Sequence, residues 1–182
     1  MSRNYKFHNK EGLYFVSFAV VHWIDVFVRE EYSDCIVKNL NYCVANKGMK
    51  IFAWCLMTSH LHLIFKSTEQ KPEELLRDLK SFTAKALLSL IANNPQESRK
   101  VWLLNAFRKT ASINTKNKNN QFWQRHNKPI ELWSNTVIDQ KIDYIHNNPV
   151  VSGFVEKAED WKYSSAKDYC NDEKGLVKLC LI

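Results

Sequence analysis

Residues 50–65 read KIFAWCLMTSHLHLIF, and this stretch decides most of the fold. Lys50–Met57 and His60–Phe65 are both rich in β-branched, aromatic and other apolar residues, a composition that favours strands. The break between the two runs, Met57-Thr58-Ser59, fits either a tight turn or a bulge. We therefore expect two strand-like runs in this part of the chain.

Strand and helix patterns alternate on both sides of this pair. Leu13–Trp23 (LYFVSFAVVHW) predicts a strand. Residues 33–47 have apolar side chains at helical spacing and predict a helix, with Ser33 as its N-cap and Gly48 as its stop. Pro72 opens a longer helix that extends to about residue 91. The apolar stripe expected on that helix consists of Leu75, Leu76, Leu79, Phe82, Ala86 and Leu87.

The second half of the chain is less regular. Residues 97–107 predict a shorter helix, and 110–121 (TASINTKNKNNQ) predict a polar, basic loop. Residues 122–133 are short and strand-like. A helix capped by Asn135 or Thr136 follows and is stopped by Pro149, and a last short helix is expected near 164–170.

This order of elements predicts an α+β fold. The arrangement that we expect is a ferredoxin-like antiparallel sheet with helices packed on one face. The chain of 182 residues, 45% of them hydrophobic, suits a single domain over residues 1–182 with the loop at 110–121 inserted in it.

Composition excludes several classes of protein. Met1–Lys10 is polar and basic, and the apolar runs are too short to cross a bilayer, so we expect a cytoplasmic protein without a membrane partner. The five cysteines have no CxxC spacing and are expected to be reduced thiols; Cys55 is expected in the core. No phosphate-binding or dinucleotide-binding glycine motif is present, which argues against nucleotide hydrolysis.

The net charge of +7 is unevenly distributed. Residues 71–130 contain 12 Lys and Arg side chains against 4 Asp and Glu, whereas residues 131–182 contain 6 against 9. A basic middle segment fits a surface that contacts a polyanion, and it also fits a solvated Lys-rich face. Charge alone leaves both interpretations open.

His60 and His62 are the first candidates for chemistry. Residues two apart in a strand project to the same side, so the two imidazoles converge on one point. Imidazoles alone favour Zn²⁺, Ni²⁺ or Cu²⁺, and an Mg²⁺-like ion requires oxygen ligands as well. The same pattern fits two histidines on the exposed face of a strand, or a structural zinc site.

Tyr144 is the second candidate. If its helix continues to Asn148, the two side chains share one helix face because they are four residues apart. A tyrosine hydroxyl beside a divalent cation can attack phosphorus and form a phosphotyrosine. The alternative is a tyrosine at a helix end that packs its ring in the core.

Two motifs together resemble a known family. Residues 54–64 (WCLMTSHLHLI) resemble the His-hydrophobe-His (HUH) segment of single-tyrosine transposases. Residues 143–155 (DYIHNNPVVSGFV) and 161–165 (WKYSS) look like the tyrosine-bearing and Trp-Ser segments of REP-associated tyrosine transposases. The resemblance covers most of residues 14–165. This chain has Thr58-Ser59 where the family commonly has Pro-Asn.

The resemblance implies an activity and a set of roles. It implies an antiparallel sheet with helices, a divalent metal (Mg²⁺ or Mn²⁺) bound by His60 and His62 with Asn148 as third ligand, and Tyr144 as nucleophile. The substrate implied is single-stranded DNA near hairpins, cut to a 5′-phosphotyrosine and a free 3′-hydroxyl by an enzyme that works as a homodimer. The alternative is a nucleic-acid-binding module on the same fold that has lost cleavage.

Basic and aromatic side chains complete the hypothesis. Phe122 or Trp123 could stack on unpaired bases, although a core position suits either ring equally well. His146 could assist proton transfer, but it lies two residues from Tyr144 and so on another face of the helix. The side chains expected to neutralise the DNA backbone are Lys80, Lys85, Arg108, Lys109, Arg125 and Lys128.

Overall fold

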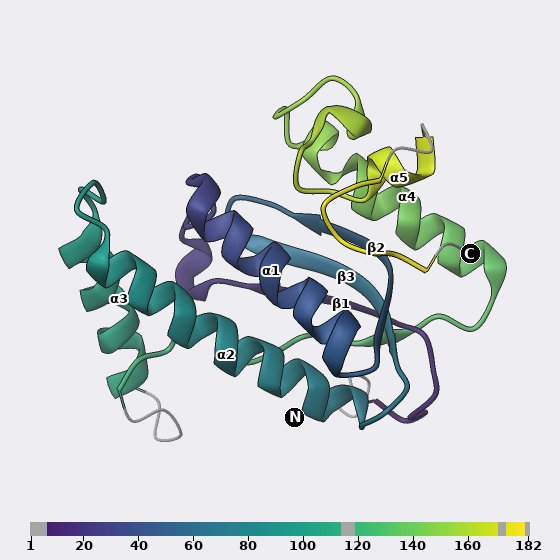
Figure 1. Ribbon diagram of the computed structural model, residues 1–182, viewed down its shortest axis with the longest axis horizontal. Coiled ribbons are helices and arrows are strands. Elements are labelled where there is room, and N and C mark those ends of the chain that lie inside the picture. Colours follow the sequence, from purple (N-terminus) through teal and green to yellow (C-terminus); the bar gives the residue numbers. More distant parts are fainter. Residues whose placement is uncertain (1–6, 114–118, 171–173, 181–182) are drawn as a thin grey trace.

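The computed structural model describes residues 7–113, 119–170 and 174–180 (Figure 1). Its centre is a four-stranded antiparallel sheet with the order β2-β3-β1-β4. The element order β1-α1-β2-β3-α2-β4 with this sheet order is the ferredoxin-like arrangement, so the predicted α+β class is confirmed. The strands are β1 (Tyr14–Ala19), β2 (Met49–Leu56), β3 (His60–Ser67) and β4 (Ile130–Glu131).

Two long helices cover one face of the sheet. Helices α1 (Glu30–Asn46) and α2 (Pro72–Asn93) lie side by side over it (Figure 1). Their inner sides meet alternate residues of the strands, which leaves the polar sides of both helices in solvent. The core on this face includes Tyr14, Val16 and Phe18 of β1, Ile36 and Leu40 of α1, and Leu76 and Leu79 of α2.

A third helix lies against the opposite face. Helix α4 (Asn135–Val151) contacts β2 and β3 there, and its Ile145 packs in a second core with Phe15 and Ile64. The expectation of helices on one face therefore holds for α1 and α2, and α4 adds a layer behind the sheet. The strand sequences explain this second layer, because near-continuous apolar runs are typical of strands that are buried on both faces.

Shorter elements close the edges of this sandwich. Helix α3 (Lys100–Ser112) follows α2, and the short helices η1 (Val21–Trp23), η2 (Ala158–Asp160) and α5 (Ala166–Cys170) lie in connections. The C-terminal chain runs along β2, where Leu56 N donates to Tyr163 O (2.8 Å) and Ser165 N donates to Trp54 O (2.9 Å). The outer edge of β2 is thus paired along this stretch.

The helix ends differ from the predicted caps. The N-cap of helix α1 is Arg29, four residues before the predicted Ser33, and Ser33 is buried inside the helix with its hydroxyl donating to Phe27 O (3.1 Å). Helix α4 is capped by Ser134, whose Oγ accepts from Val137 N (3.3 Å). Pro149 lies inside α4 rather than stopping it, because a proline one turn from the end removes only one helical hydrogen bond.

Other predictions were partly wrong. Phe82 is 66% exposed, outside the buried stripe of α2. Residues 122–133 form only β4 and an isolated bridge between Val20 and Trp123, since Pro129 interrupts regular pairing. The loop predicted at 110–121 begins after α3 ends at Ser112, and residues 114–118 lie outside the described residues.

All five cysteines are free thiols, and Cys55 is buried, which raises its pKa to about 12. Among the described ranges, none of the helices has the length and apolar character needed to cross a membrane.

Candidate active site

The turn between β2 and β3 positions the two histidines. Met57 N donates to His60 O (2.8 Å), and the neighbouring segments donate to the turn carbonyls, Val20 N to Ser59 O and Phe27 N to Thr58 O (2.8 Å each). The Thr58 hydroxyl donates to the Asp25 carboxylate (2.6 Å). Thr58-Ser59 therefore makes a well-held turn that fixes the start of β3.

His60 and His62 point their Nε2 atoms at each other. The two nitrogens are 3.0 Å apart, as expected for residues two apart on one strand. Two ligands at right angles on one cation with metal–nitrogen bonds of about 2.1 Å have about this separation, so the pair fits a divalent cation. The Nδ1 atom of His62 is buried without a hydrogen-bond partner in the described part of the chain, so the contact with His60 Nε2 is the hydrogen bond that this ring makes there.

Burial keeps both imidazoles neutral. It lowers the pKa of His60 against the opposing effect of Asp25. It also lowers the pKa of His62 to about 3, with further contributions from His60 and from the Lys141 ammonium. Neutral imidazole is the form that binds metals, so both rings have a lone pair available at neutral pH.

Tyr144 lies beside this pair. Helix α4 brings its ring to 5.3 Å from the His62 ring, and Phe15 packs against both at 5.8 Å and 5.9 Å. Tyr144 is 48% exposed, so part of the residue is open to solvent. The two motifs, 82 residues apart in the sequence, meet in one site.

Asn148 is one helical turn beyond Tyr144 in α4, which is continuous past both residues. Its side chain is half-buried, and the helix places it on the same face as Tyr144. Within the described ranges no group of three or more His, Cys, Asp or Glu side chains could hold a metal ion. Asn148 carries an amide oxygen, a donor of the oxygen type that hard cations such as Mg²⁺ accept.

Lys141 is a site residue that the sequence reasoning missed. Its Nζ lies 5.1 Å from the centre of the Phe15 ring and 5.4 Å from that of Tyr144. It places a positive charge beside the tyrosine. Its position three residues before Tyr144 on one helix was the signal that could have found it.

His146 anchors α4. Its Nε2 is 2.8 Å from Ser165 Oγ. This hydroxyl in turn accepts a hydrogen bond from Trp54 N of β2 and donates one to Trp54 O. Burial lowers the pKa of His146 to about 4, against the opposing effect of Asp143. A ring held in this way faces the sheet and not the Tyr144 hydroxyl, which supports a positioning role over proton transfer.

Lys80 differs from the other basic candidates because its ammonium is already bound. It donates to Gln124 O (2.7 Å) and Asn127 Oδ1 (2.5 Å) and lies over the Phe18 ring. Burial lowers the pKa of Lys80 to about 8. This lysine fixes the segment after residue 119 onto α2.

The other five basic candidates are exposed. Lys85 and Arg125 line a groove of about 560 Å³ between α2 and residues 119–125. Phe122 and Trp123 also line it, but both are core residues, and Trp123 Nε1 donates to Thr83 Oγ1 (3.0 Å), so stacking on bases does not suit them. The exposed cations are Lys85, Arg108, Lys109, Arg125 and Lys128.

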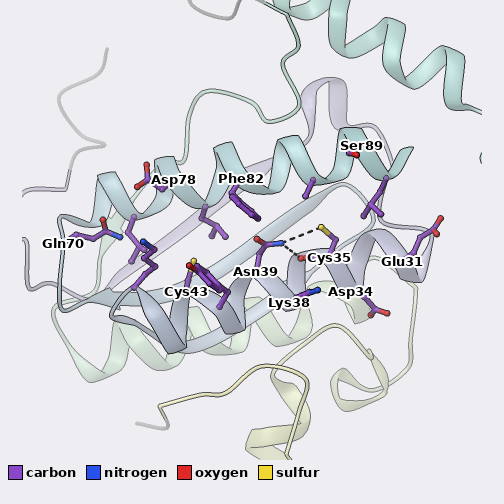
Figure 2. A pocket seen from close by; sticks show the side chains of 16 residues that line it. Glu31, Asp34, Cys35, Lys38, Asn39, Cys43, Gln70, Asp78, Phe82 and Ser89 are labelled. Carbon is purple, nitrogen blue, oxygen red and sulfur yellow. Dashed lines mark hydrogen bonds between the residues drawn. The ribbon is translucent and has the colours of Figure 1, made fainter. Parts of the chain in front are cut away.

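A larger groove, of about 990 Å³, lies on the outer side of α1 and α2 (Figure 2). Asn39 Nδ2 donates to Cys35 O within it (2.7 Å), and exposed Tyr42 and Phe82 flank its apolar floor. None of the candidate site residues lines it, so its size does not mark the centre of the chemistry.

Comparisons with known proteins agree with the two motifs. No family model matches the chain. A curated Haemophilus influenzae protein named as a REP-associated tyrosine transposase is 29% identical over 118 residues, 62% of this chain and 56% of that protein. The chain thus spans about half the length of this relative.

Solved structures share the fold. The structure of a REP-associated tyrosine transposase bound to a REP hairpin has a TM-score of 0.67 at 17% identity, over 99% of this chain and 92% of that one. A Deinococcus radiodurans transposase structure has a TM-score of 0.43 at 19% identity, over 81% and 95% of the two chains. The predicted resemblance to REP-associated tyrosine transposases is confirmed.

Proposed function

We propose that this protein is a divalent-metal-dependent endonuclease and strand transferase that acts on single-stranded DNA beside hairpins through Tyr144. The observation that carries the proposal is the meeting of the Tyr144 ring, 5.3 Å from His62, with two imidazoles whose Nε2 atoms are 3.0 Å apart. The name of the Haemophilus relative and the fold shared with a hairpin-bound transposase support it. We also propose that the enzyme acts as a homodimer.

Each site residue has a role in this proposal. His60 and His62, with the Asn148 amide oxygen, would hold Mg²⁺ or Mn²⁺. When bound, the cation withdraws charge from a phosphate oxygen and so favours attack at phosphorus. The exposed cations along α2 and α3 and near residue 125 would neutralise the backbone of the strand.

The covalent step uses this chain's own tyrosine. The Tyr144 hydroxyl loses its proton to solvent, and its oxygen forms a bond to phosphorus as the bond from phosphorus to the 3′-oxygen breaks. That 3′-oxygen takes up a proton, and the 5′-phosphate stays on the tyrosine. The Lys141 ammonium, 5.4 Å from the centre of the Tyr144 ring, would place a positive charge beside the attacking group. Attack by another 3′-hydroxyl reverses the step and joins a new strand.

Covalent capture tests the proposal. A labelled hairpin oligonucleotide with single-stranded flanks is incubated with Mn²⁺ and analysed on a denaturing gel. We expect an adduct with the wild type, none with Tyr144→Phe, and none when EDTA replaces Mn²⁺. Tyr42→Phe is the matched control, because Tyr42 is exposed to a similar degree (55%) but lies on α1. An adduct with Tyr144→Phe would remove Tyr144 from the mechanism, and binding without any adduct would favour a non-cleaving DNA-binding module.

A further inference from the structure

Trp23 is an exposed indole at the mouth of the histidine pair. Its side chain is 57% exposed, and its ring centre is 5.2 Å from that of His60. Both Trp23 and the preceding His22 have positive φ angles, 56° and 57°. Bulky residues rarely adopt this conformation, which strains the backbone. The fold thus holds a large apolar ring in solvent in a strained turn.

Contacts on two sides fix this turn. Trp23 N donates to Val20 O (3.1 Å), and the His22 ring shares a hydrogen bond with Thr110 Oγ1 of α3 (2.8 Å). Just beyond the turn, Arg99 Nη1 donates to Asp25 O (2.9 Å). Trp23 is therefore carried by a braced segment rather than a loose one, and a rigid ring loses little freedom when a ligand stacks on it.

The indole is open to a flat ligand. The Trp23 and His60 ring planes meet at 75°, so the imidazole does not cover the indole by stacking. Unpaired nucleobases stack on aromatic rings in a largely sequence-independent way, because every base has a π-face. An exposed indole beside a candidate phosphate-cutting site has the chemistry to hold an unpaired base.

The order of the rings indicates which base. Trp23 contacts His60, His60 contacts His62 (4.7 Å), and His62 contacts Tyr144 (5.3 Å). In an in-line displacement the attacking and leaving oxygens lie on opposite sides of phosphorus. If Tyr144 attacks from the His62 end, the 3′-oxygen leaves toward the His60 end, where Trp23 lies.

We propose that Trp23 stacks on the nucleobase that precedes the cleaved phosphate and so holds the departing 3′-hydroxyl in place for strand transfer. This inference rests on the proposed function for the identity of that phosphate, but the stacking itself needs neither metal nor cleavage. It adds a substrate-positioning residue that neither motif contains.

A binding measurement tests the stacking without chemistry. In a Tyr144→Phe background, affinity is measured for a hairpin with single-stranded dT flanks and for the same hairpin with abasic flanks. Adding Trp23→Ala should weaken binding to the dT probe roughly 5- to 150-fold, the range for loss of one base stack. It should leave the abasic probe unchanged, and Trp23→Phe should recover much of the loss. The control is Trp102→Ala on α3, where Trp102 is 56% exposed.

If Trp23→Ala weakened binding equally to both probes, Trp23 would have a structural role and the inference would be overturned. No effect on the affinity for either probe would also overturn it. Abasic scanning of the cleavage site then locates the base through adduct formation. The wild type should form more adduct than Trp23→Ala on the other substrates. This difference in adduct formation should vanish when the abasic position is the one that precedes the cleaved phosphate. If it vanishes only at the position that follows, the assignment to the leaving side is wrong. If neither protein forms an adduct, the proposed function fails while the binding comparison still decides the stacking.

Discussion

Glu97 shows how single residues hold the helices beside the site in place. Its fully buried carboxylate accepts from Arg29 Nε (3.0 Å), Arg99 Nε (3.1 Å) and the Tyr32 hydroxyl (3.3 Å). It therefore joins the start of α1 to the start of α3, close to the turn that carries Trp23. Burial alone would raise the pKa of Glu97, but the hydrogen bonds and charge of Arg99 and the hydrogen bond from Arg29 outweigh it and lower the pKa to about 2.

This depressed pKa predicts a pH dependence of folding. A carboxyl that titrates near pH 2 when folded and near 4.5 when unfolded contributes stability above pH 4.5 and loses it as pH falls toward 2. The contribution at neutral pH is about 3 kcal/mol. We expect Glu97→Gln to lower the free energy of unfolding by an amount of this order at pH 7 and by progressively less below pH 4.5, measured by urea denaturation.

Glu156→Gln is the control for Glu97, because Glu156 is exposed. It should leave both the stability and its pH dependence close to those of the wild type. A Glu97→Gln protein that loses as much stability at pH 3 as at pH 7 would show that the carboxylate charge is not what matters.

At the residue scale, the site was predictable only where a pattern marked it. Strand alternation placed His60 and His62 on one face, and helical spacing linked Tyr144 to Asn148. Nothing local marked Trp23, because an irregular left-handed turn places it beside His60. The hydrogen bonds that occupy the Lys80 ammonium were also not predictable, because their acceptors lie about 45 positions away in the sequence.

Among the elements, α4 matters most because it carries Tyr144. Its buried side contacts the back of the sheet through Ile142 and Ile145. His146 adds a directional bond to Ser165, which is tied to Trp54 on β2 (2.9 Å). Apolar packing holds the helix against the sheet, and this polar link sets its orientation, because hydrogen bonds are directional and hydrophobic contacts are not.

We therefore expect His146→Ala and Ser165→Ala to act as a coupled pair. Each should lower the free energy of unfolding by about 1–3 kcal/mol, the cost of leaving a buried polar partner unsatisfied. Each should also slow formation of the Tyr144 adduct while DNA affinity stays unchanged. The double variant should lose less than the sum of the two single losses, as measured by a double-mutant cycle in urea.

The conservative change His146→Gln separates positioning from proton transfer. Its amide can donate to Ser165 Oγ but cannot act as a base at neutral pH, so it should restore much of the adduct rate. A rate as low as that of His146→Ala, in a protein of wild-type stability, would favour proton transfer instead.

The elements themselves were largely predictable, and their packing less so. Long periodic segments such as α2 were predicted within two residues at their ends. Phe122 and Trp123, predicted to lie in a strand, sit instead in an irregular segment that is buried through contacts with Phe27 and Phe107, which no local pattern encodes. The second helical layer was also missed, although the unbroken apolar runs of β2 and β3 carried its signal.

For the whole molecule, the distribution of charge becomes a feature of the surface. The described residues of the basic segment 71–130 lie mainly in α2, α3 and the stretch that packs beside α2, where Lys85 and Arg125 line the groove of about 560 Å³. The segment after residue 130, with fewer cations than carboxylates, supplies α4 and covers the back of the sheet. The net charge of +7 thus combines a cationic region with a more acidic one.

This separation predicts which lysines and arginines hold DNA. Each phosphate contact to a single strand contributes about 0.7 to the slope of log affinity against log salt. Lys85→Ala and Arg125→Ala should each reduce the slope for a dT oligonucleotide by about this amount. Lys80→Met should leave the slope unchanged and instead destabilise the fold, because the Lys80 ammonium already donates hydrogen bonds to Gln124 and Asn127. Lys38→Ala, an exposed lysine on α1, is the control with no expected effect. An unchanged slope for both Lys85→Ala and Arg125→Ala would place the DNA strand elsewhere on the molecule.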